Sequence, residues 1–589
     1  MRISLSVYAA LTVVLTFVCH PTLAAVGPRA TLKVSNKVVN PDGFKRSSTV
    51  VQGSHPGPLI TAKKGETFRL NVVNDLTDKT MLRSTSIHWH GMLQHQSAWA
   101  DGPVGITQCP ISPGRSFQYE FTNKDKAGTH WYHSHFGTQY CDGLRGPIVI
   151  YDPQDPHRLL YDESTVITLA DWFLRYHTVG PSLGGIPIAD STLINGLGRY
   201  PGGPAAPLAI INVQRGRRYR FRLVSMSCDP NYMFSIDGHD MTVIEADGEN
   251  TVPMTVNAIQ IFAGQRYSFV LHANQNVDNY WIRALPNAIT PEMELAKGFK
   301  GGINSAILRY KGARAVDPKT TQQKKVNLLS EAKLRPLLLD PRAPGKPYPG
   351  GADVNINLDM SMNSQGFTIN GKNFHEPSVP LLLQLMSGAK TAQELLPDGP
   401  LFVLPRNKVI ELTMPAGVVG GPHPFHLHGH PFSVVKSAGE TKPNYLNPLR
   451  RDVVSAGDIG SNVTIRFVTD NPGPWIMHCH IDFHYVNGLA VVFAEDPDSL
   501  KSKPTPAPAP APKWNLFNSF YNLWKPPTPP APTNPPAAWN ELCPIYDALS
   551  AADTEVQLVP RSGVNHFHHA HRHFKHSSSG LRGLEQGPA

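Results

Sequence analysis

Short apolar or alternating runs, separated by glycine, proline and asparagine, dominate the chain between about residues 30 and 498. Runs of this kind are typical of β-strands. We expect strands at residues 30–34, 67–73, 116–121, 146–151, 219–223, 267–272, 409–414 and 463–468. Helical periodicity is scarce, and we expect short helical pieces only at residues 379–387 and 391–396. The regular spacing of short strands predicts an all-β protein built from sandwiches or barrels.

The composition changes after Asp498. Residues 503–512 are rich in proline and alanine, residues 525–536 are again rich in proline, and an aromatic segment lies between them. Such stretches favour an extended conformation and do not bury a core. The tail also carries histidines, at positions 566, 568, 569, 571, 573 and 576. They could hold metal, but nothing nearby fixes a ligand geometry. We therefore interpret residues 499–589 as a Pro-rich and His-rich extension that is largely disordered.

The N-terminus has the pattern of a secretory signal. Arg2 precedes an apolar run at residues 7–18, and small residues follow at Thr22 and Ala24. We expect a signal peptide at residues 1–24 and a secreted protein. The apolar run is too short to span a membrane, and no second candidate span is visible. The net charge of +9 would suit nucleic acid. Because the chain carries no nucleic-acid-binding fingerprint and is expected to be secreted, we exclude that class of partner.

The segment His478-Cys479-His480, followed by His484, points to a metal. Alternate side chains of a strand share a face, so Cys479 would point one way and the two flanking histidines the other. One segment could then hold a thiolate-bound metal on one side and give two imidazoles to a separate metal cluster on the other. The short backbone between the two sites is suited to moving single electrons.

Three further His-X-His pairs accompany this segment: His88/His90, His133/His135 and His426/His428. Each pair would place two imidazoles on one face of a strand. Together with His478 and His480 they give eight imidazoles, which is too many for one ion and suits a cluster of three. A single pair of this kind is weak evidence, but four pairs do not arise plausibly by chance.

His423 remains, and with Cys479 and His484 it would complete the His2Cys ligand set of blue copper. Thiolate and imidazole select copper or zinc. Zinc is the alternative metal, although it usually takes closed four-ligand sites and has no use for an electron path. His430 forms another His-X-His with His428. We interpret His430 as structural, because the cluster is full without it.

Four long motifs resemble the copper motifs of the multicopper oxidases: HWHG (88–91), HWYHSHFGTQYCDGLRGP (130–147), HPFHLHGH (423–430) and HCHIDFH (478–484). Their flanks, among them SAWADGP, RYRFRLVSMSCDPNY and GLAVVFAEDP, are similar to fungal laccases of the basidiomycete type. The resemblance runs from about Val26 to Asp498 and returns near Leu542. It implies three consecutive cupredoxin-like Greek-key β-barrels, which we place at residues 25–155, 156–329 and 330–498.

The resemblance also implies four copper ions and their ligands. A type 1 copper would be held by His423, Cys479 and His484. A type 2 copper would be held by His88 and His426. A type 3 pair would take the remaining six: His90, His133, His135, His428, His478 and His480. The axial position of type 1 copper falls on Leu489, which cannot coordinate. We therefore expect a higher reduction potential than in relatives with methionine there.

The same resemblance implies roles for several acidic residues. Asp101 and Asp482 match positions proposed for proton relay, and the alternative is that each only orients histidines or water. The phenolic substrate is expected to be oxidised at an exposed edge of His484. Asp229 would accept the phenolic hydrogen there, although an aspartate before proline is also a common turn residue. Asn287 is expected to line the same pocket.

The expected pocket walls depart from the family pattern. Four positions carry smaller or non-aromatic side chains where many relatives have aromatic residues or leucine: Ile186, Ile188, Ala288 and Met362. Fewer stacking surfaces predict a roomy cleft with broad, weak substrate binding.

Four cysteines remain once Cys19 leaves with the signal and Cys479 is assigned to copper: Cys109, Cys141, Cys228 and Cys543. An even number suits disulfides in an oxidising compartment, and the sequence alone allows three pairings. The resemblance implies Cys109–Cys543 and Cys141–Cys228. Asn462 begins an N-glycosylation sequon.

These expectations describe a laccase. It would oxidise phenols or aromatic amines one electron at a time and reduce O2 to water, plausibly in the degradation of lignin or other phenolic compounds. We expect it to be a monomer. A ferroxidase on the same scaffold is the first alternative, but it would need several carboxylates near the type 1 edge, where only Asp229 can be named. A non-enzymatic copper-binding cupredoxin protein would not need all eight cluster histidines.

Overall fold

The structure is a computed structural model that describes residues 25–124, 126–174, 188–286, 298–418, 421–500 and 534–550. Within these ranges strands dominate and helices are short, as the apolar pattern predicts. The expected signal peptide, the two Pro-rich stretches up to residue 533 and the His-rich tail lie outside the described residues. No helix of the described part is both long and apolar enough to cross a bilayer.

The first sandwich consists of two sheets, with strand orders β2-β1-β4-β6 and β3-β8-β7-β5. Its strands are β1 (Arg29–Val39), β2 (Arg46–Val51), β3 (Ile60–Lys63), β4 (Thr67–Asp75), β5 (Ile87–His90), β6 (Ser116–Thr122), β7 (Gly128–Ser134) and β8 (Arg145–Tyr151). In β4, Phe68, Leu70 and Val72 have no exposed surface while the residues between them are partly exposed. The strand therefore buries one face against the opposite sheet, as its period of two requires.

The second sandwich has strand orders β10-β9-β12-β17-β14-β15 and β11-β19-β18-β13-β16. Its strands are β9 (Glu163–Trp172), β10 (Ser191–Ile194), β11 (Ile210–Val213), β12 (Arg218–Ser225), β13 (Tyr232–Ile236), β14 (Met241–Ala246), β15 (Glu249–Val256), β16 (Ile259–Ile261), β17 (Arg266–His272), β18 (Asn279–Pro286) and β19 (Ser305–Tyr310). Phe221, Phe234 and Phe269 meet in the core between the two sheets.

The third sandwich has strand orders β20-β24-β29-β26-β27 and β23-β31-β30-β25-β28, with a separate hairpin β21-β22. Its strands are β20 (Val354–Asn357), β21 (Met360–Asn363), β22 (Gly366–Ile369), β23 (Leu401–Leu404), β24 (Val409–Pro415), β25 (Pro424–Leu427), β26 (Phe432–Lys436), β27 (Arg450–Arg451), β28 (Val453–Ser455), β29 (Asn462–Val468), β30 (Gly473–Cys479) and β31 (Ala490–Glu495).

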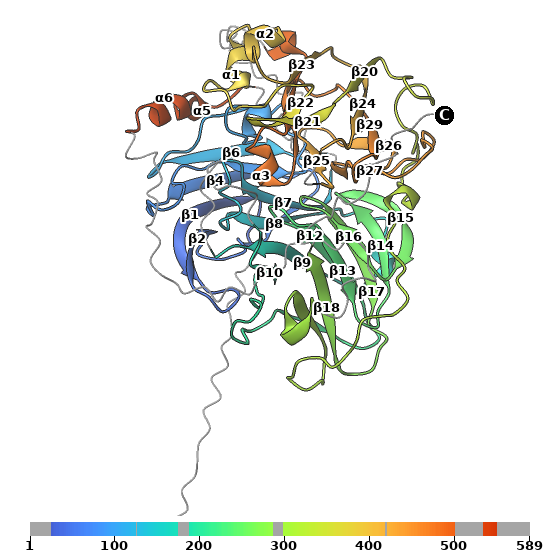
Figure 1. The fold of residues 1–589 in the computed structure, drawn as a ribbon. Helices are drawn as coiled ribbons and strands as arrows, with labels where there is room; N and C mark the ends of the chain where they lie inside the picture. Colours follow the sequence, from blue (N-terminus) through green and yellow to red (C-terminus); the bar gives the residue numbers. More distant parts are fainter. Residues whose placement is uncertain are drawn as a thin grey trace, which may run out of the picture.

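The same topology repeats three times. Each of the six main sheets contains one parallel strand pair, while its other pairs are antiparallel. The pairs are β1–β4 and β3–β8, then β9–β12 and β11–β19, then β20–β24 and β23–β31. This repeat is the expected cupredoxin-like arrangement of three consecutive domains (Figure 1). The boundaries expected near 155 and 329 fall in the β8–β9 and β19–β20 connections, and their placement stays a prediction.

The helices are short and cover edges of the sandwiches: α1 (Leu381–Met386), α2 (Ala392–Leu395), α3 (Asp482–Tyr485), α4 (Pro497–Leu500), α5 (Ala537–Asn540), α6 (Leu542–Asp547) and the single 3-10 turns Ala98–Ala100, Arg158–Leu160, Lys300–Gly302 and Glu331–Lys333. Both predicted helical pieces occur. Pro380 directly precedes α1, and α2 begins with a capping box in which Thr391 accepts from the Glu394 amide and Glu394 accepts from the Thr391 amide.

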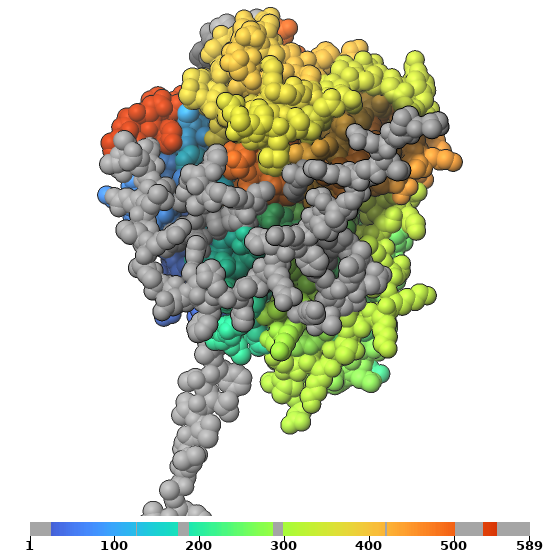
Figure 2. Space-filling view, viewed as in Figure 1, coloured from blue at the N-terminus to red at the C-terminus, as the bar shows by residue number. Residues whose placement is uncertain are grey.

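Two disulfides tie distant segments together, in the pairing that the resemblance implies. Cys109 bonds Cys543, and Cys141 bonds Cys228. The first attaches α6 to the first sandwich, where Trp539 of α5 also donates its indole N–H to the Thr107 carbonyl at 3.0 Å. Figure 2 shows this red segment seated beside the blue first sandwich. The second joins the loop before β8 to the loop after β12.

Buried arginines join the three sandwiches. Arg266 of β17 donates to both carboxylate oxygens of Asp452, at 2.5 and 2.7 Å, and to the Thr129 carbonyl of β7 at 3.0 Å. Arg451 of β27 donates to Asp247 at 2.9 Å. Both arginines have no exposed surface. Because a buried cation without its partner is costly, these pairs fix how the sandwiches sit against one another.

We predict that Arg451→Met lowers the stability of the fold substantially. The change leaves Asp247 with one less buried partner and removes the bond to Tyr267 and the ion pair with Glu331. Breaking a buried pair from one side costs about 3–5 kcal/mol. The midpoint of guanidinium unfolding should fall accordingly. Arg342→Met removes an exposed pair with Asp340 and should leave the midpoint unchanged. Equal midpoints for both variants would contradict the role given to Arg451.

Candidate metal centres

Strand register brings the predicted histidines together. In the first sandwich β5 pairs with β7 so that His88 lies opposite His133. In the third, β25 pairs with β30 so that His426 lies opposite His478. The two pairs lie close together across the sandwiches, since His88 Nε2 lies 3.4 Å from His426 Nε2. The cluster is therefore built across the junction of the first and third sandwiches.

The eight histidines of the His-X-His pairs form compact groups. Ring nitrogens lie within 4.8 Å of one another in three sets: His90, His133 and His480; His135, His428 and His478; and His88, His90 and His426. None of the eight rings is more than 4% exposed. Two of these sets share no residue, and His88 and His426 remain as a pair. The assignment of these groups to a type 3 pair and a type 2 site stays a prediction.

Burial keeps seven of these eight imidazoles neutral. It holds the pKa of His90, His133, His135, His426, His428 and His480 well below the usual value, and the neighbouring imidazoles lower it further. Burial also lowers the pKa of His478 to about 4. Neutral imidazole is the form that binds a metal ion. In the cluster, His133 Nε2 and both ring nitrogens of His135 are buried without a hydrogen-bond partner among the described residues. Such atoms are expensive unless a ligand or ion satisfies them, so the donor set fits copper.

The far ring nitrogens are held by the protein. Most donate to backbone or carboxylate oxygens: His88 to the Asp101 carbonyl (2.9 Å), His133 to the Ser134 carbonyl (2.9 Å), His426 to the Asp452 carbonyl (2.9 Å), His428 to Asp101 Oδ2 (2.8 Å) and His478 to the Cys479 carbonyl (3.0 Å). In each of these the bonded atom is Nδ1, so Nε2 is left to face the cluster. His90 is reversed: its Nδ1 lies 3.2 Å from His480 Nε2, and its Nε2 lies 3.4 Å from Asp452.

A second, separate set lies on the other face of β30. His423 Nδ1 and His484 Nδ1 are 3.1 Å apart, and Cys479 Sγ lies 3.6 Å from each. An ion at the centre of this triangle would be roughly 2 Å from every ligand atom, close to ordinary metal–nitrogen bonds of about 2.0–2.1 Å and somewhat shorter than metal–sulfur bonds of about 2.3 Å. Cys479 is the free cysteine of the described residues. Burial raises its thiol pKa, so a bound metal would have to displace the proton.

Leu489 occupies the position expected beside this set. It is fully buried in the same apolar core as Cys479. Its carbonyl accepts from the Cys479 amide at 3.0 Å, and its amide donates to the His484 carbonyl at 3.0 Å. The backbone therefore fixes Leu489 against both ligands with a side chain that offers no lone pair.

One expectation about His484 is wrong. We expected an exposed edge, but the residue has no exposed surface, because Phe367 packs against its ring with the centroids 4.6 Å apart. His484 Nε2 is buried and has no hydrogen-bond partner among the described residues. Burial, and then His423, lowers the pKa of His484 to about 3.

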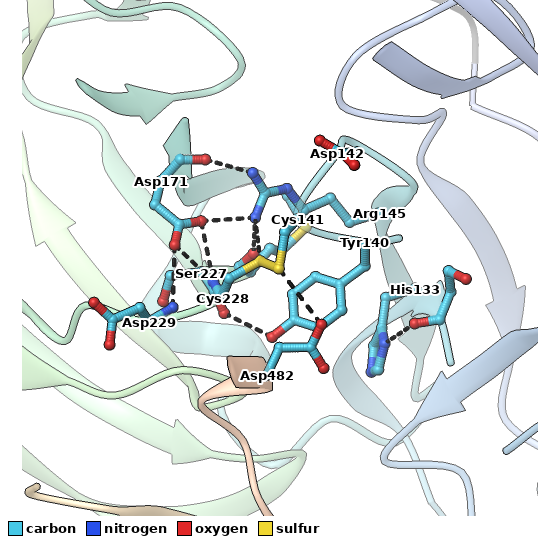
Figure 3. Close-up of a disulfide and its surroundings, with 12 residues drawn as sticks. His133, Tyr140, Cys141, Asp142, Arg145, Asp171, Ser227, Cys228, Asp229 and Asp482 are labelled. Atoms are coloured by element: carbon cyan, nitrogen blue, oxygen red, sulfur yellow. Dashed lines mark hydrogen bonds and ion pairs between the residues drawn. A yellow bond between two sulfur atoms is a disulfide. The ribbon is translucent and has the colours of Figure 1, made fainter. Parts of the chain in front are cut away.

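The predicted acidic residues lie in different surroundings. Asp101 is fully buried and contacts two cluster rings, through its carbonyl to His88 and its carboxylate to His428. The Asp482 carboxylate instead lies 3.4 Å from the Cys141 sulfur, and burial, with Glu376 and Asp171 nearby, holds its pKa well above the usual value (Figure 3). Among the described residues no hydrogen bond joins that carboxylate to a cluster histidine.

Several predicted residues around the pocket are only partly placed. Asn287, Ile186 and Ala288 lie outside the described residues. Ile188 is 89% exposed and Met362 is 51% exposed. The roomy cleft stays a prediction.

Two residues outside the cluster occupy positions that bear on other predictions. His430 lies 3.0 Å from Glu495 and belongs to no ligand group of the described residues, in line with its structural interpretation. Asn462 begins β29 and accepts from Lys436 Nζ at 2.5 Å. Its glycosylation stays a prediction.

Some residues at the site carry no sequence signal. Asp452 supports two cluster rings, His426 through its carbonyl and His90 through its carboxylate, and is paired with Arg266. The Tyr140 hydroxyl lies 3.4 Å from His480 Nδ1. Neither residue is a ligand in the motifs, and their roles depend on contacts between sandwiches.

Comparison with known proteins agrees with this geometry. Residues 33–155, 163–313 and 374–499 match sequence models of multicopper oxidase domains. The chain is 56% identical to Laccase-2 of Pleurotus ostreatus over 91% of its length and 95% of the relative's. It is 53% identical to Laccase-4 of Trametes villosa over 90% of its own length and 96% of the relative's.

Solved structures have the same fold. The laccase of Botrytis aclada superimposes with a TM-score of 0.72 at 29% identity, covering 91% of this chain and 96% of that one. Fet3p, a multicopper oxidase that functions in iron import, also superimposes with a TM-score of 0.72. It is 25% identical, and the match covers 92% of this chain and 100% of that one. The matched domains, the identity to these relatives and the two ligand sets lead to one conclusion: the chain belongs to the multicopper oxidases.

Proposed function

We propose that this multicopper oxidase works as a laccase, which takes single electrons from phenolic or aromatic-amine donors and reduces O2 to two waters. One observation carries the proposal. Cys479 and the His478/His480 pair leave the same short segment toward different ligand sets. The ferroxidase alternative has less support, because the curated relatives at 53–56% identity are laccases while the iron-import protein shares 25%.

A protein of this family carries four copper ions, of which one accepts electrons from the donor and three together reduce O2. We assign the single type 1 site to His423, Cys479 and His484. We assign type 2 copper to His88 and His426. The type 3 pair takes two triads: His90, His133 and His480 on one side and His135, His428 and His478 on the other. The backbone of β30 and residue 480 joins the type 1 set to both triads.

The donor step separates an electron from a proton. Copper bound by His423, Cys479 and His484 would supply one-electron oxidation of a phenol, and Asp229 would accept the hydroxyl proton, so that the donor would leave as a neutral phenoxyl radical. Four such steps supply the four electrons that convert O2 and four protons to two waters. Burial first, and the charge of Asp171 second, raises the pKa of Asp229 to about 7. Above that pH the carboxylate is ready to accept the proton, and below it the group is already protonated.

Protons must also reach the oxygen site. Asp101 is the better placed of the two predicted relay residues, since its carboxylate bonds His428 directly. It orients that ring and can pass a proton along the same hydrogen bond. Asp482 acts farther away, beside the disulfide.

We further propose that the protein is secreted, acts as a monomer and serves the breakdown of lignin or related phenols.

Cys479→Ser should abolish the donor site without dismantling the cluster. Serine removes the thiolate, while the eight cluster histidines stay in place. The variant should lack the blue absorption of a copper thiolate, keep about three of four coppers, and lose oxygen uptake with a methoxyphenol. Copper analysis, visible spectra and an oxygen electrode measure these changes. Unchanged colour or unchanged uptake would contradict the assignment.

Leu489→Met should lower the reduction potential of the type 1 site. A thioether placed in the apolar space of Leu489 can coordinate weakly, and axial ligation favours the oxidised ion. Redox titration of the blue band measures the potential. Val491→Met, which changes a residue of β31 in the same apolar core, is the control and should leave the potential unchanged. Equal potentials for the Leu489→Met protein and the wild type would show that residue 489 does not face the metal.

Asp229→Asn should remove the proton acceptor. We expect kcat/KM for a methoxyphenol to fall about 10- to 100-fold at pH 7.5 and its rise with pH near pH 7 to disappear. Oxidation of ferrocyanide, a donor that carries no proton, should keep its wild-type pH profile. Steady-state oxygen uptake across pH measures both, and a phenol profile identical to wild type would exclude Asp229 as the base.

A further inference from the structure

The backbone that carries Asp229 is held where the three sandwiches meet (Figure 3). Three consecutive carbonyls accept hydrogen bonds from other elements: Met226 from Arg145 (2.5 Å), Ser227 from the Tyr140 hydroxyl (3.1 Å) and Cys228 from the Asp482 amide (2.9 Å). The Cys141–Cys228 disulfide adds a covalent link to the first sandwich. This segment is therefore fixed before it reaches the substrate carboxylate.

Asp171, near the end of β9, accepts hydrogen bonds from the backbone amides of Cys228 and Asp229. The Cys228 amide donates to both of its oxygens, at 3.0 and 2.9 Å, and the Asp229 amide donates to Oδ2 at 3.0 Å. Its Oδ1 also accepts from Arg145 Nη1 at 2.9 Å. Asp171 and Arg145 have no exposed surface. One carboxylate thus faces a cation on one side and the Asp229 backbone on the other.

The charge of Asp171 acts on Asp229 as well. After burial, Asp171 is the group that raises the pKa of the Asp229 carboxyl, which reaches about 7. Other charged or titratable groups near Asp229 come from different elements: Arg145 of β8, Tyr232 of β13, Cys479 of β30 and Asp482 of α3. Asp171 differs from them because it also bonds the Asp229 amide, so its effects on position and charge arise from one contact.

We propose that Asp171 is a positioning residue for phenol oxidation, which fixes the backbone carrying Asp229 and acts on that carboxyl through its own negative charge. The inference rests on the proposed role of Asp229 as proton acceptor. A negative neighbour favours the protonated form of Asp229. Asp171 therefore sets the pH at which the acceptor becomes available and strengthens the base once it is deprotonated.

The test uses Asp171→Asn in the full-length four-copper enzyme. Asparagine keeps one oxygen for the two amides and removes the charge. For a methoxyphenol, we expect the acid limb of kcat/KM to move to lower pH by up to about one unit, because Asp229 then loses its proton more easily. For ferrocyanide the profile, kcat and KM should stay at wild-type values. In an Asp229→Asn background the second substitution should move nothing further.

A matched control is available beside the same disulfide. Asp142 is also a buried carboxylate paired with an arginine, Arg46 at 2.7 Å, and among the described residues its side chain bonds no part of residues 226–229 (Figure 3). Asp142→Asn should leave the phenol acid limb in place. A shift of equal size in this variant would show that any lost buried charge produces it, and would overturn the proposal.

The outcomes separate the two hypotheses. If Asp229→Asn keeps the wild-type phenol profile, the proton-acceptor role fails. If it flattens the profile but Asp171→Asn leaves the limb unmoved, or lowers the rates for both donors equally, Asp171 is structural only and the inference fails. Asp171→Ser is the second variant should the asparagine protein not accumulate. Failure of both to fold with copper would show that assembly requires Asp171 and would likewise overturn the proposal.

Discussion

The alternation of side chains along β30 is the constraint on which the rest of the structure depends. Because successive residues of a strand face opposite ways, Cys479 can join His423 and His484 while His478 faces the cluster and His480, just beyond the strand end, reaches it too. A slip of one residue in the β25–β30 register would turn the thiolate toward the cluster and its histidines away. The separation of the two metal sites is thus a consequence of strand pairing.

The histidine cluster also requires that the first and third sandwiches hold a fixed relative position. Its imidazoles are buried, and half of them come from the first sandwich and half from the third. Such a site works only if the two sandwiches hold a fixed relation, since small displacements would separate facing ligand atoms. The buried pairs of Arg266 with Asp452 and Arg451 with Asp247 supply that relation through the second sandwich. The middle domain gives no histidine to the described cluster, yet it fixes the junction.

Local features of the structure could be predicted from the sequence, whereas contacts between distant segments could not. The two ligand sets were inferred from long motifs, and their roles stay predictions. Strand positions follow from local periodicity, so β4 and β24 were predicted correctly. The burial of His484 was not, because it depends on Phe367 from a separate hairpin. Asp452 and Asp171 also gave no local signal. Their importance comes from partners more than fifty residues away along the chain, such as Arg266 and Cys228.

The position of Asp171 shows how structural and chemical roles can share one group. A carboxylate buried for structural reasons needs a cation, and Arg145 provides it. The same carboxylate has lone pairs left over, and the amides of residues 228 and 229 occupy them. Its residual charge then falls on the next carboxyl along that backbone. Arg145 bonds Oδ1 of Asp171, whereas the Asp229 amide bonds Oδ2. A residue of the domain junction can therefore also influence when the donor loses its proton.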